Sequence, residues 1–190
     1  MGRISESQAN AALRPYYQTV FEAVQDGYTE YMQSDYVAIH CPRSIATNLN
    51  DHIWAQLVNR FDGVDGVFPA FDRRRNLRFV RVAAPRPILL WVKKVDPRRH
   101  YSIYPTRHAE EMLEGGQSEL LPRAAVLVLG YTPNLERTGV QRVSICPPCS
   151  KHSKPEWWID LTAVPRMRIS RTGSRPEITV QRYVQRTLGI

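Results

Sequence analysis

The sequence contains little cysteine and no long hydrophobic run. Three cysteines among 190 residues are an odd number, which excludes a complete disulfide framework and favours a reducing compartment. The first residues lack an apolar stretch of signal-peptide length, and no window approaches the roughly 18 apolar residues that cross a bilayer. These absences predict a cytoplasmic protein that does not act on a membrane.

The short motifs of several enzyme classes are also missing. None of the four lysines follows an acidic residue by two positions, so the (Asp/Glu)-x-Lys pattern of metal-dependent nucleases is absent. No Walker loop, Gly-x-Ser-x-Gly, Gly-x-Gly-x-x-Gly or His-Glu-x-x-His occurs. The enzyme classes that depend on these motifs are therefore disfavoured.

What the chain has is concentrated positive charge. Residues 73–107 contain eleven basic side chains and one acid, a local charge of +10, whereas the whole chain carries +8. The tail from Val164 to Ile190 adds six Arg against one Glu. Such a concentration favours phosphate or an acidic protein as a partner. The residues predicted to bind RNA, DNA or a protein partner are Arg73, Arg74, Arg75, Lys93, Lys94, Arg98 and Arg99.

Hydrophobic periodicity predicts two N-terminal helices. Apolar residues at steps of three and four indicate a helix over residues 9–32, and Pro15 suggests that its regular part starts near Arg14. A second helix is expected after an N-cap at Ser44, with Asp62-Gly63 as its end. Both helices are expected to pack on one face of a sheet.

Short extended runs after Gly66 predict that sheet. The expected strands are Val67–Phe71, Leu77–Val82, Ile88–Val95, Ala124–Tyr131, Val140–Ile145 and Trp157–Leu161. Their spacing favours an antiparallel meander, with Ile88–Val92 as the central strand and a short helix over Arg107–Leu113. The predicted fold is therefore a single α+β domain over residues 1–165, with a basic C-terminal extension, 166–190, packed on it or trailing from it.

One basic segment also carries candidate catalytic groups. His100, Tyr104, Arg107 and His108 lie within nine residues, close to Lys93 and Lys94 in the sequence. Small messenger-cleaving bacterial ribonucleases use this chemistry: His or Tyr moves the proton of the 2′-hydroxyl, and Arg or Lys stabilises the pentacoordinate phosphate. If the segment is catalytic, these groups should converge on one concave patch. One alternative is a solvated loop with a basic rim, in which Tyr104-Pro105 anchors a turn. Another is a binding loop, in which Tyr101 and Tyr104 stack on unpaired bases while the arginines follow the backbone.

A Cys-Pro-Pro-Cys turn suggests a metal site. Cys146, Cys149 and His152 could bind zinc, with Cys41 or His40 as a fourth ligand. A redox motif and a rigid turn with incidental cysteines are the alternatives. No cofactor other than zinc is expected.

The order of segments between Ile88 and Leu161 resembles a known family. The matching features are Lys93-Lys94 at a strand end, Tyr104-Pro105-Thr106-Arg107, Leu121-Pro122, Val128-Leu129-Gly130-Tyr131, Gly139 with Val143, and Trp157-Trp158. They resemble an uncharacterised family of small bacterial proteins encoded beside a regulator that joins a helix-turn-helix to a metallopeptidase-like domain.

The resemblance implies a toxin–antitoxin or phage-defence module, in which the chain would be the basic effector and its partner a cognate antitoxin or regulator. It assigns no catalytic residue, so whether the chain is an enzyme stays open. The alternative function is a mobile-element or phage protein that binds nucleic acid, or inhibits a bacterial immune complex, without catalysis.

Overall fold

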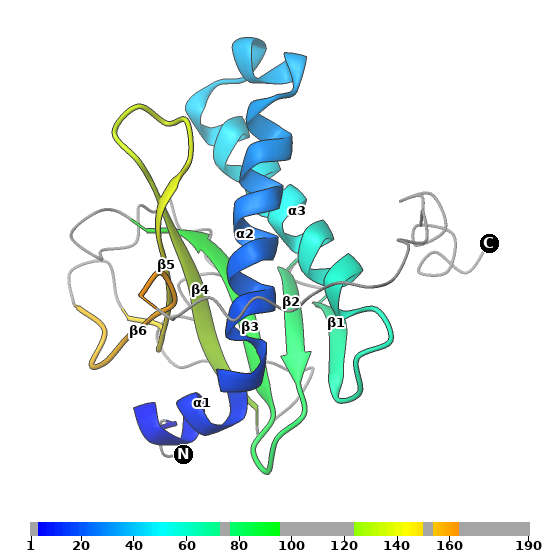
Figure 1. Cartoon of the computed structure of the whole chain (residues 1–190), viewed down its shortest axis with the longest axis vertical. Coiled ribbons are helices and arrows are strands. Elements are labelled where there is room, and N and C mark those ends of the chain that lie inside the picture. Colours follow the sequence, from blue (N-terminus) through cyan, green and yellow to red (C-terminus); the bar gives the residue numbers. More distant parts are fainter. Residues whose placement is uncertain (1–3, 73–76, 96–123, 150–153, 164–190) are drawn as a thin grey trace.

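The computed structural model describes residues 4–72, 77–95, 124–149 and 154–163. Within these ranges, helices α1 to α3 precede strands β1 to β6, and the strands form one sheet (Figure 1). The predicted α+β class is confirmed in this coarse form. The short helix expected over 107–113 and the extension 166–190 lie outside the described residues.

The first helical segment begins earlier than predicted. Helix α1, Glu6–Leu13, starts after Ser5, whose side chain accepts from the backbone N–H of Gln8 while the Gln8 side chain accepts from the N–H of Ser5. A 3-10 turn, η1 (Arg14–Tyr16), then joins α1 to α2, Tyr17–Met32. Pro15 has no N–H to donate, which explains the interruption. The single helix expected over residues 9–32 is therefore two helices joined by a 3-10 turn, and its long regular part starts at Tyr17, three residues after the predicted Arg14.

The second predicted helix is confirmed with a different start. Helix α3, Pro42–Phe61, follows the 3-10 turn η2, Asp35–Ile39. Its N-cap is Cys41 and not Ser44, because Pro42 at the first helical position needs no hydrogen-bond partner and has a φ suited to a helix. The helix ends at Phe61, in agreement with the expected stop.

The sheet is mostly antiparallel. Its strands, in spatial order, are β1 (Val67–Asp72), β2 (Leu77–Val82), β3 (Ile88–Lys94), β4 (Ala125–Pro133), β5 (Val140–Cys146) and β6 (Ile159–Asp160). Four neighbouring pairs are antiparallel, but β3 and β4 are parallel. The expected antiparallel meander is therefore wrong at this pair. Residues 95–124 provide enough chain to return to the opposite edge of the sheet, as a parallel connection requires.

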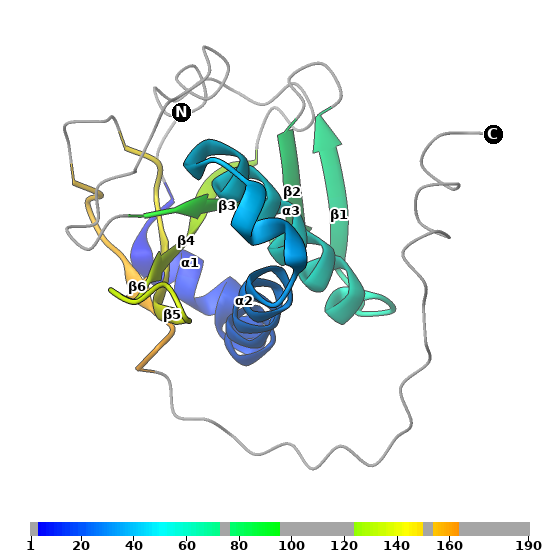
Figure 2. The same ribbon diagram turned by 90° about the horizontal axis from the view of Figure 1, so that it is seen from above.

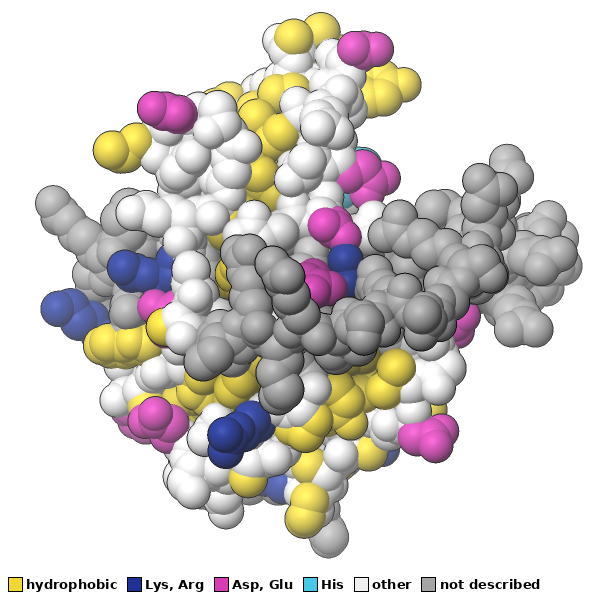
Figure 3. Space-filling view, viewed as in Figure 1, with side chains coloured by type: hydrophobic (Ala, Val, Ile, Leu, Met, Phe, Trp, Pro, Cys, Tyr) yellow, Lys and Arg dark blue, Asp and Glu magenta, His cyan; other side chains and the backbone are white. Residues whose placement is uncertain are grey.

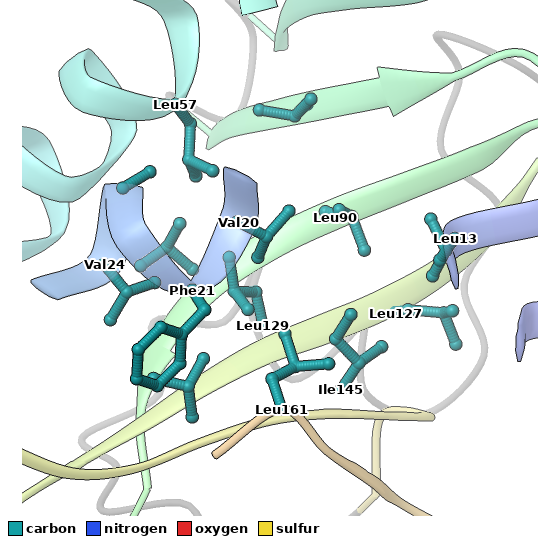
Figure 4. Packing of buried hydrophobic residues seen from close by; sticks show 14 of the residues in the cluster. Leu13, Val20, Phe21, Val24, Leu57, Leu90, Leu127, Leu129, Ile145 and Leu161 are labelled. Atoms are coloured by element: carbon teal, nitrogen blue, oxygen red, sulfur yellow. The ribbon is translucent and has the colours of Figure 1, made fainter. Parts of the chain in front are cut away.

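The helices cover one face of the sheet, as predicted. Figure 2 shows α1, α2 and α3 on the same side of the strands. Side chains from this layer meet the sheet in a continuous apolar core (Figure 4), which includes Leu13, Val20, Phe21, Val24, Leu57, Leu90, Leu127, Leu129 and Ile145. Burial of this apolar surface is the main favourable contribution to folding.

A second, smaller cluster lies on the opposite face. It contains Phe79, Leu89, Trp91 and Val128, together with Cys146 and Cys149. Strand β3 contributes to both clusters, because Leu89 and Leu90 point to opposite faces and both are buried. The predicted position of Ile88–Val92 as the central strand is thus confirmed.

None of the described helices combines the length and the apolar character needed to cross a bilayer.

Candidate functional site at one edge of the sheet

The sheet topology places three strand ends at the same edge. Strands β1 and β3 are both antiparallel to β2, so they run in the same direction, and β4 is parallel to β3. The ends of these strands at Asp72, Lys94 and Pro133 therefore lie at one edge, named here the upper edge from its place in Figure 1. The C-terminal end of α2 and the start of α3 lie at the same end of the molecule.

Both segments that hold the predicted binding residues leave from this edge. Arg73, Arg74 and Arg75 follow the end of β1 at Asp72 directly, and Arg98 and Arg99 follow Val95 by three and four positions. These five arginines lie outside the described residues, as do the candidate catalytic residues His100, Tyr104, Arg107 and His108. Their convergence on one patch stays a prediction.

Lys93 and Lys94, the two predicted binding residues that are described, point to opposite faces of β3. Lys93 shares the face of Trp91, and its Nζ lies 3.9 Å from the centre of the Trp91 ring. Lys94 lies on the helix-covered face, since successive strand residues alternate. A patch on one face of the sheet would therefore contain one of these lysines and not both.

The environment of Lys93 changes its chemistry. Burial lowers the pKa of the Lys93 ammonium to about 8. Its neighbour on β4 is Gly130, where a Cβ would lie 2.5 Å from Cγ2 of Val95, so Val95 occupies the place of a side chain beside the lysine. A lysine of this kind exchanges a proton near neutral pH, a property found at catalytic and binding sites.

On the helix-covered face, Lys94 pairs in register with Tyr131 of β4. The Tyr131 side chain is fully buried, and its hydroxyl has no hydrogen-bond partner among the residues that the structure describes. Burial raises the pKa of this phenol. Burial also lowers the pKa of Lys94, as does the nearby charge of Arg137. A buried polar group without a partner costs free energy and often marks a functional position.

Tyr131 belongs to a wider group of tyrosines and histidines. Its ring meets the ring of Tyr28 edge to face at a centroid distance of 6.4 Å, and the Tyr28 hydroxyl donates to the carbonyl of Arg137 at 3.0 Å. The latter bond fixes the β4–β5 hairpin to α2. The cluster extends along α2 to Tyr31, which is also buried.

Tyr31 and Asn48 orient His40. The Tyr31 hydroxyl lies 2.9 Å from Nδ1 of His40, and the Asn48 side-chain nitrogen lies 3.2 Å from the same atom. Both groups therefore approach the same ring nitrogen and hold the imidazole in place. His52 approaches the Tyr31 ring at 5.5 Å, and its Nδ1 lies 3.6 Å from a carboxylate oxygen of Glu30.

Sequence reasoning missed this group, apart from His40 as a possible metal ligand. No short motif links its members, which come from four parts of the chain: Tyr28 and Tyr31 from α2, His40 after η2, Asn48 and His52 from α3, and Tyr131 from β4. The signal that could have found it is the excess of aromatic residues near the end of α2, where Tyr28, Tyr31 and Tyr36 follow one another at short intervals.

The two cysteines of the Cys-Pro-Pro-Cys turn are buried and form no disulfide. Both pack on the face opposite the helices, whereas His40 contacts Tyr31 on the helix side, so the sheet separates them from the proposed fourth ligand. Across the described ranges, no group of three or more His, Cys, Asp and Glu side chains is placed to hold a metal ion. His152 lies outside these ranges, and zinc at Cys146, Cys149 and His152 stays a prediction.

Charge is divided unevenly along the chain. Of the 26 Lys and Arg, 11 lie in the described residues, together with 12 of the 18 Asp and Glu. The net positive charge is therefore contributed by the remaining residues. Acidic side chains are spread over the helix layer (Figure 3). Within the predicted basic segment, Arg78 forms an ion pair with Asp51 of α3 and stacks on Trp54, so its charge is already paired with a residue of the fold.

Comparison of the chain with protein-family models, curated proteins and solved structures finds no match. The resemblance to the bacterial family therefore stays a proposal, which rests on the short motifs alone.

Proposed function

We propose that this chain is the basic effector of a bacterial toxin–antitoxin or phage-defence module and that it acts on nucleic acid, by metal-independent cleavage of RNA. The observation that carries the proposal is the common edge of β1, β3 and β4. The segments with Arg73 to Arg75 and with Arg98 and Arg99 both leave from this edge, where Lys93 and Lys94 also lie. Several cations at one edge can neutralise successive phosphates of one strand.

The chemistry of the described residues agrees with this proposal. Burial lowers the pKa of Lys93 to about 8, so its amine can exchange a proton on the face of the sheet opposite the helices. His40 lies on the helix side of the sheet and is not part of the same patch as Lys93. Cleavage of RNA through its 2′-hydroxyl requires a base, an acid and a cation, and needs no metal ion. The proposed partner is a cognate antitoxin or regulator that covers the basic edge with acidic side chains.

Binding of nucleic acid without catalysis is the second candidate, as in a mobile-element or phage protein or an inhibitor of a bacterial immune complex. The opposite orientation of Lys93 and Lys94 favours it, because a strand that wraps around the edge can contact both lysines, whereas one catalytic patch on a face contains one.

Two measurements test the proposal. Fluorescence anisotropy with labelled RNA and DNA of equal length should show an affinity that falls steeply as salt rises, because bound cations release counterions from the phosphates. Expression of the chain without its neighbouring genes should arrest growth if it is a toxin. Absence of binding at low salt would contradict the nucleic-acid function, and binding without growth arrest or RNA cleavage would favour the second candidate.

A further inference from the structure

Three rings form a stack that leads from the core to the surface between α2 and α3. The planes of Tyr31 and His40 are inclined by 9° at a centroid distance of 6.2 Å, and those of Tyr36 and His40 by 18° at the same distance. These three rings are named the ring ladder. We propose that the ring ladder is a stacking site for an unpaired base of a single-stranded nucleic acid, an inference that rests on the proposed function.

The inner part of the ladder is rigid. Tyr31 is 1% exposed, and its hydroxyl and the Asn48 amide both approach Nδ1 of His40, which fixes the tilt of the imidazole. The ring of His52 also packs against Tyr31, with 5.5 Å between the two ring centroids. An aromatic surface that is already ordered loses little conformational entropy when a ligand stacks on it.

The outer part of the ladder is open to solvent. Tyr36, in the 3-10 turn η2, is 64% exposed. Figure 3 shows hydrophobic side chains at the tip above the sheet, where α2 ends and α3 begins. A large aromatic ring in this position is held parallel to His40 and offers its own surface to a flat partner. Bases stack on such rings whatever their sequence.

The charges at this end of the molecule are mixed: Asp35 adjoins Tyr36 in the same 3-10 turn, whereas Lys94 and Arg137 are cations that a phosphate could contact. Lys94 and Arg137 are close enough for the charge of Arg137 to lower the pKa of Lys94, so the two cations repel each other. In the described part of the chain neither has a carboxylate partner, and Arg43 in the first turn of α3 has none either. An anion bound near them would relieve the repulsion, and a nucleotide strand supplies both the anion and the flat base.

Substitution of Tyr36 tests the inference, with Ile39 as the matched control. Ile39 lies on the same 3-10 turn and is 77% exposed, but it is not part of the ladder. The probes are a short single-stranded RNA and the DNA of the same sequence, each with one 2-aminopurine base. Tyr36→Ala should weaken binding about 5- to 150-fold, the range for loss of one base–aromatic contact, whereas Tyr36→Phe and Ile39→Ala should bind like the parent protein.

Two further readouts separate stacking from a change in charge or folding. Quenching of 2-aminopurine on binding should be lost in Tyr36→Ala, while the dependence of affinity on salt should be unchanged because no phosphate contact is removed. His40→Ala should also weaken binding, since it removes the ring that orients Tyr36. Circular dichroism and the unfolding midpoint verify that each variant is folded.

The outcomes distinguish the two proposals. If the parent protein binds neither strand at low salt, the proposed nucleic-acid function fails, and the stacking site fails with it. If the parent binds and Tyr36→Ala binds equally well, the function stands and the stacking site is wrong. If Tyr36→Ala leaves the oligonucleotide affinity unchanged but abolishes capture of the protein encoded by the neighbouring gene, the ladder contacts a protein and the inference is overturned.

Discussion

The Lys93 side chain lies at a position where burial disfavours the charged ammonium form. In the folded protein the pKa of its ammonium falls to about 8, against 10.5 for an exposed lysine. The contact of Nζ with the Trp91 ring offsets a part of this cost, about 1–2 kcal/mol for a desolvated pair. Retention of a buried lysine at this edge, where an uncharged residue would be more stable, is consistent with a functional use of the amine.

The pH dependence of stability follows from the direction of this shift. Between about pH 8 and 10.5 the unfolded chain binds more protons at this lysine than the folded protein, so the contribution of Lys93 to stability rises with pH across this window. Below about pH 8 both states are protonated and the full penalty is present. Above 10.5 both are neutral and the penalty is gone.

Lys93→Met is therefore expected to stabilise the protein near pH 7. The burial cost is on the order of 3 kcal/mol, and the lost contact with Trp91 reduces the net gain to about 1–2 kcal/mol. The gain should disappear as the pH approaches 10.5, since the parent lysine is then neutral. Urea denaturation near pH 7 and near pH 10 measures it. The exposed Lys154 is the control, and an equal gain in Lys154→Met, or a loss of stability in Lys93→Met, would contradict this account.

The packing of elements depends on two glycines that differ in what surrounds them. At Gly27 of α2, a Cβ would lie 2.7 Å from Cα of Ile53 and 2.8 Å from its nitrogen, so α2 and α3 touch through their backbones. At Gly130 of β4, the nearest atom would be the side-chain Cγ2 of Val95, at 2.5 Å. The clash at Gly130 can be relieved by truncating the Val95 side chain, whereas the clash at Gly27 is with the backbone of α3, which no substitution removes.

Gly27→Ala should therefore destabilise the protein by about 3 kcal/mol, although the same change in an open helix stabilises by about 1 kcal/mol. Gly130→Ala should destabilise by about 1–3 kcal/mol, and Val95→Ala in the same chain should restore a part of this loss. Gly139→Ala is the control, because the nearest atom would lie 3.9 Å away. Thermal unfolding of the variants measures the order of these losses of stability. If Gly27→Ala leaves the stability unchanged, α2 and α3 are packed less closely than described above.

Periodicity in the sequence predicted the elements better than their boundaries or their direction. The apolar steps of α2 and α3 are visible because each helix covers one face of the sheet. The start of α1 depended on the reciprocal bonds of Ser5 and Gln8, a capping signal that can be read from the sequence. The parallel pairing of β3 and β4 was also foreseeable, because residues 95–124 are far longer than a hairpin loop.

The candidate site was predicted less well than the fold. Charge identified the segment that contains Lys93 and Lys94, but their different surroundings follow from alternation along β3 and from the neighbouring strand. The ring ladder joins Tyr31, Tyr36 and His40, which are close in sequence and were signalled by the aromatic residues near the end of α2. The surroundings of the buried Tyr131, in contrast, arise from contacts between residues distant in sequence, such as Tyr28 with Tyr131 and with Arg137. Such contacts leave no periodic signal, so they could not have been predicted from one sequence.

At the scale of the whole molecule, positive charge is concentrated in a few segments of the sequence. The described core is close to neutral, and on α2 and α3 several acids form ion pairs with basic residues of the same core: Glu22 and Asp26 with Arg60, and Asp51 with Arg78. The surplus of positive charge is contributed by the segments that flank the strands and by the C-terminal residues. A partner with an acidic surface, or a phosphate chain, would therefore be attracted to these segments more than to the described core.

Charge reversal at Arg98 and Arg99 tests whether this basic segment binds nucleic acid, a partner protein or both. Arg98→Glu together with Arg99→Glu should weaken both nucleic-acid binding and capture of the neighbouring gene's protein, and should reduce the salt dependence of each, because two cations are replaced by anions. The control is Arg14→Glu with Lys154→Glu, which makes the same change in charge at exposed residues outside the segment 73–107. Pull-down at two salt concentrations, anisotropy with RNA, and growth after induction are the readouts. If both double variants behave like the parent protein in all of these assays, residues 98 and 99 belong to a solvated basic rim with no partner. If only the variant with Arg98→Glu and Arg99→Glu loses both growth arrest and capture of the neighbouring gene's protein, the effector surface and the antitoxin surface coincide at this edge.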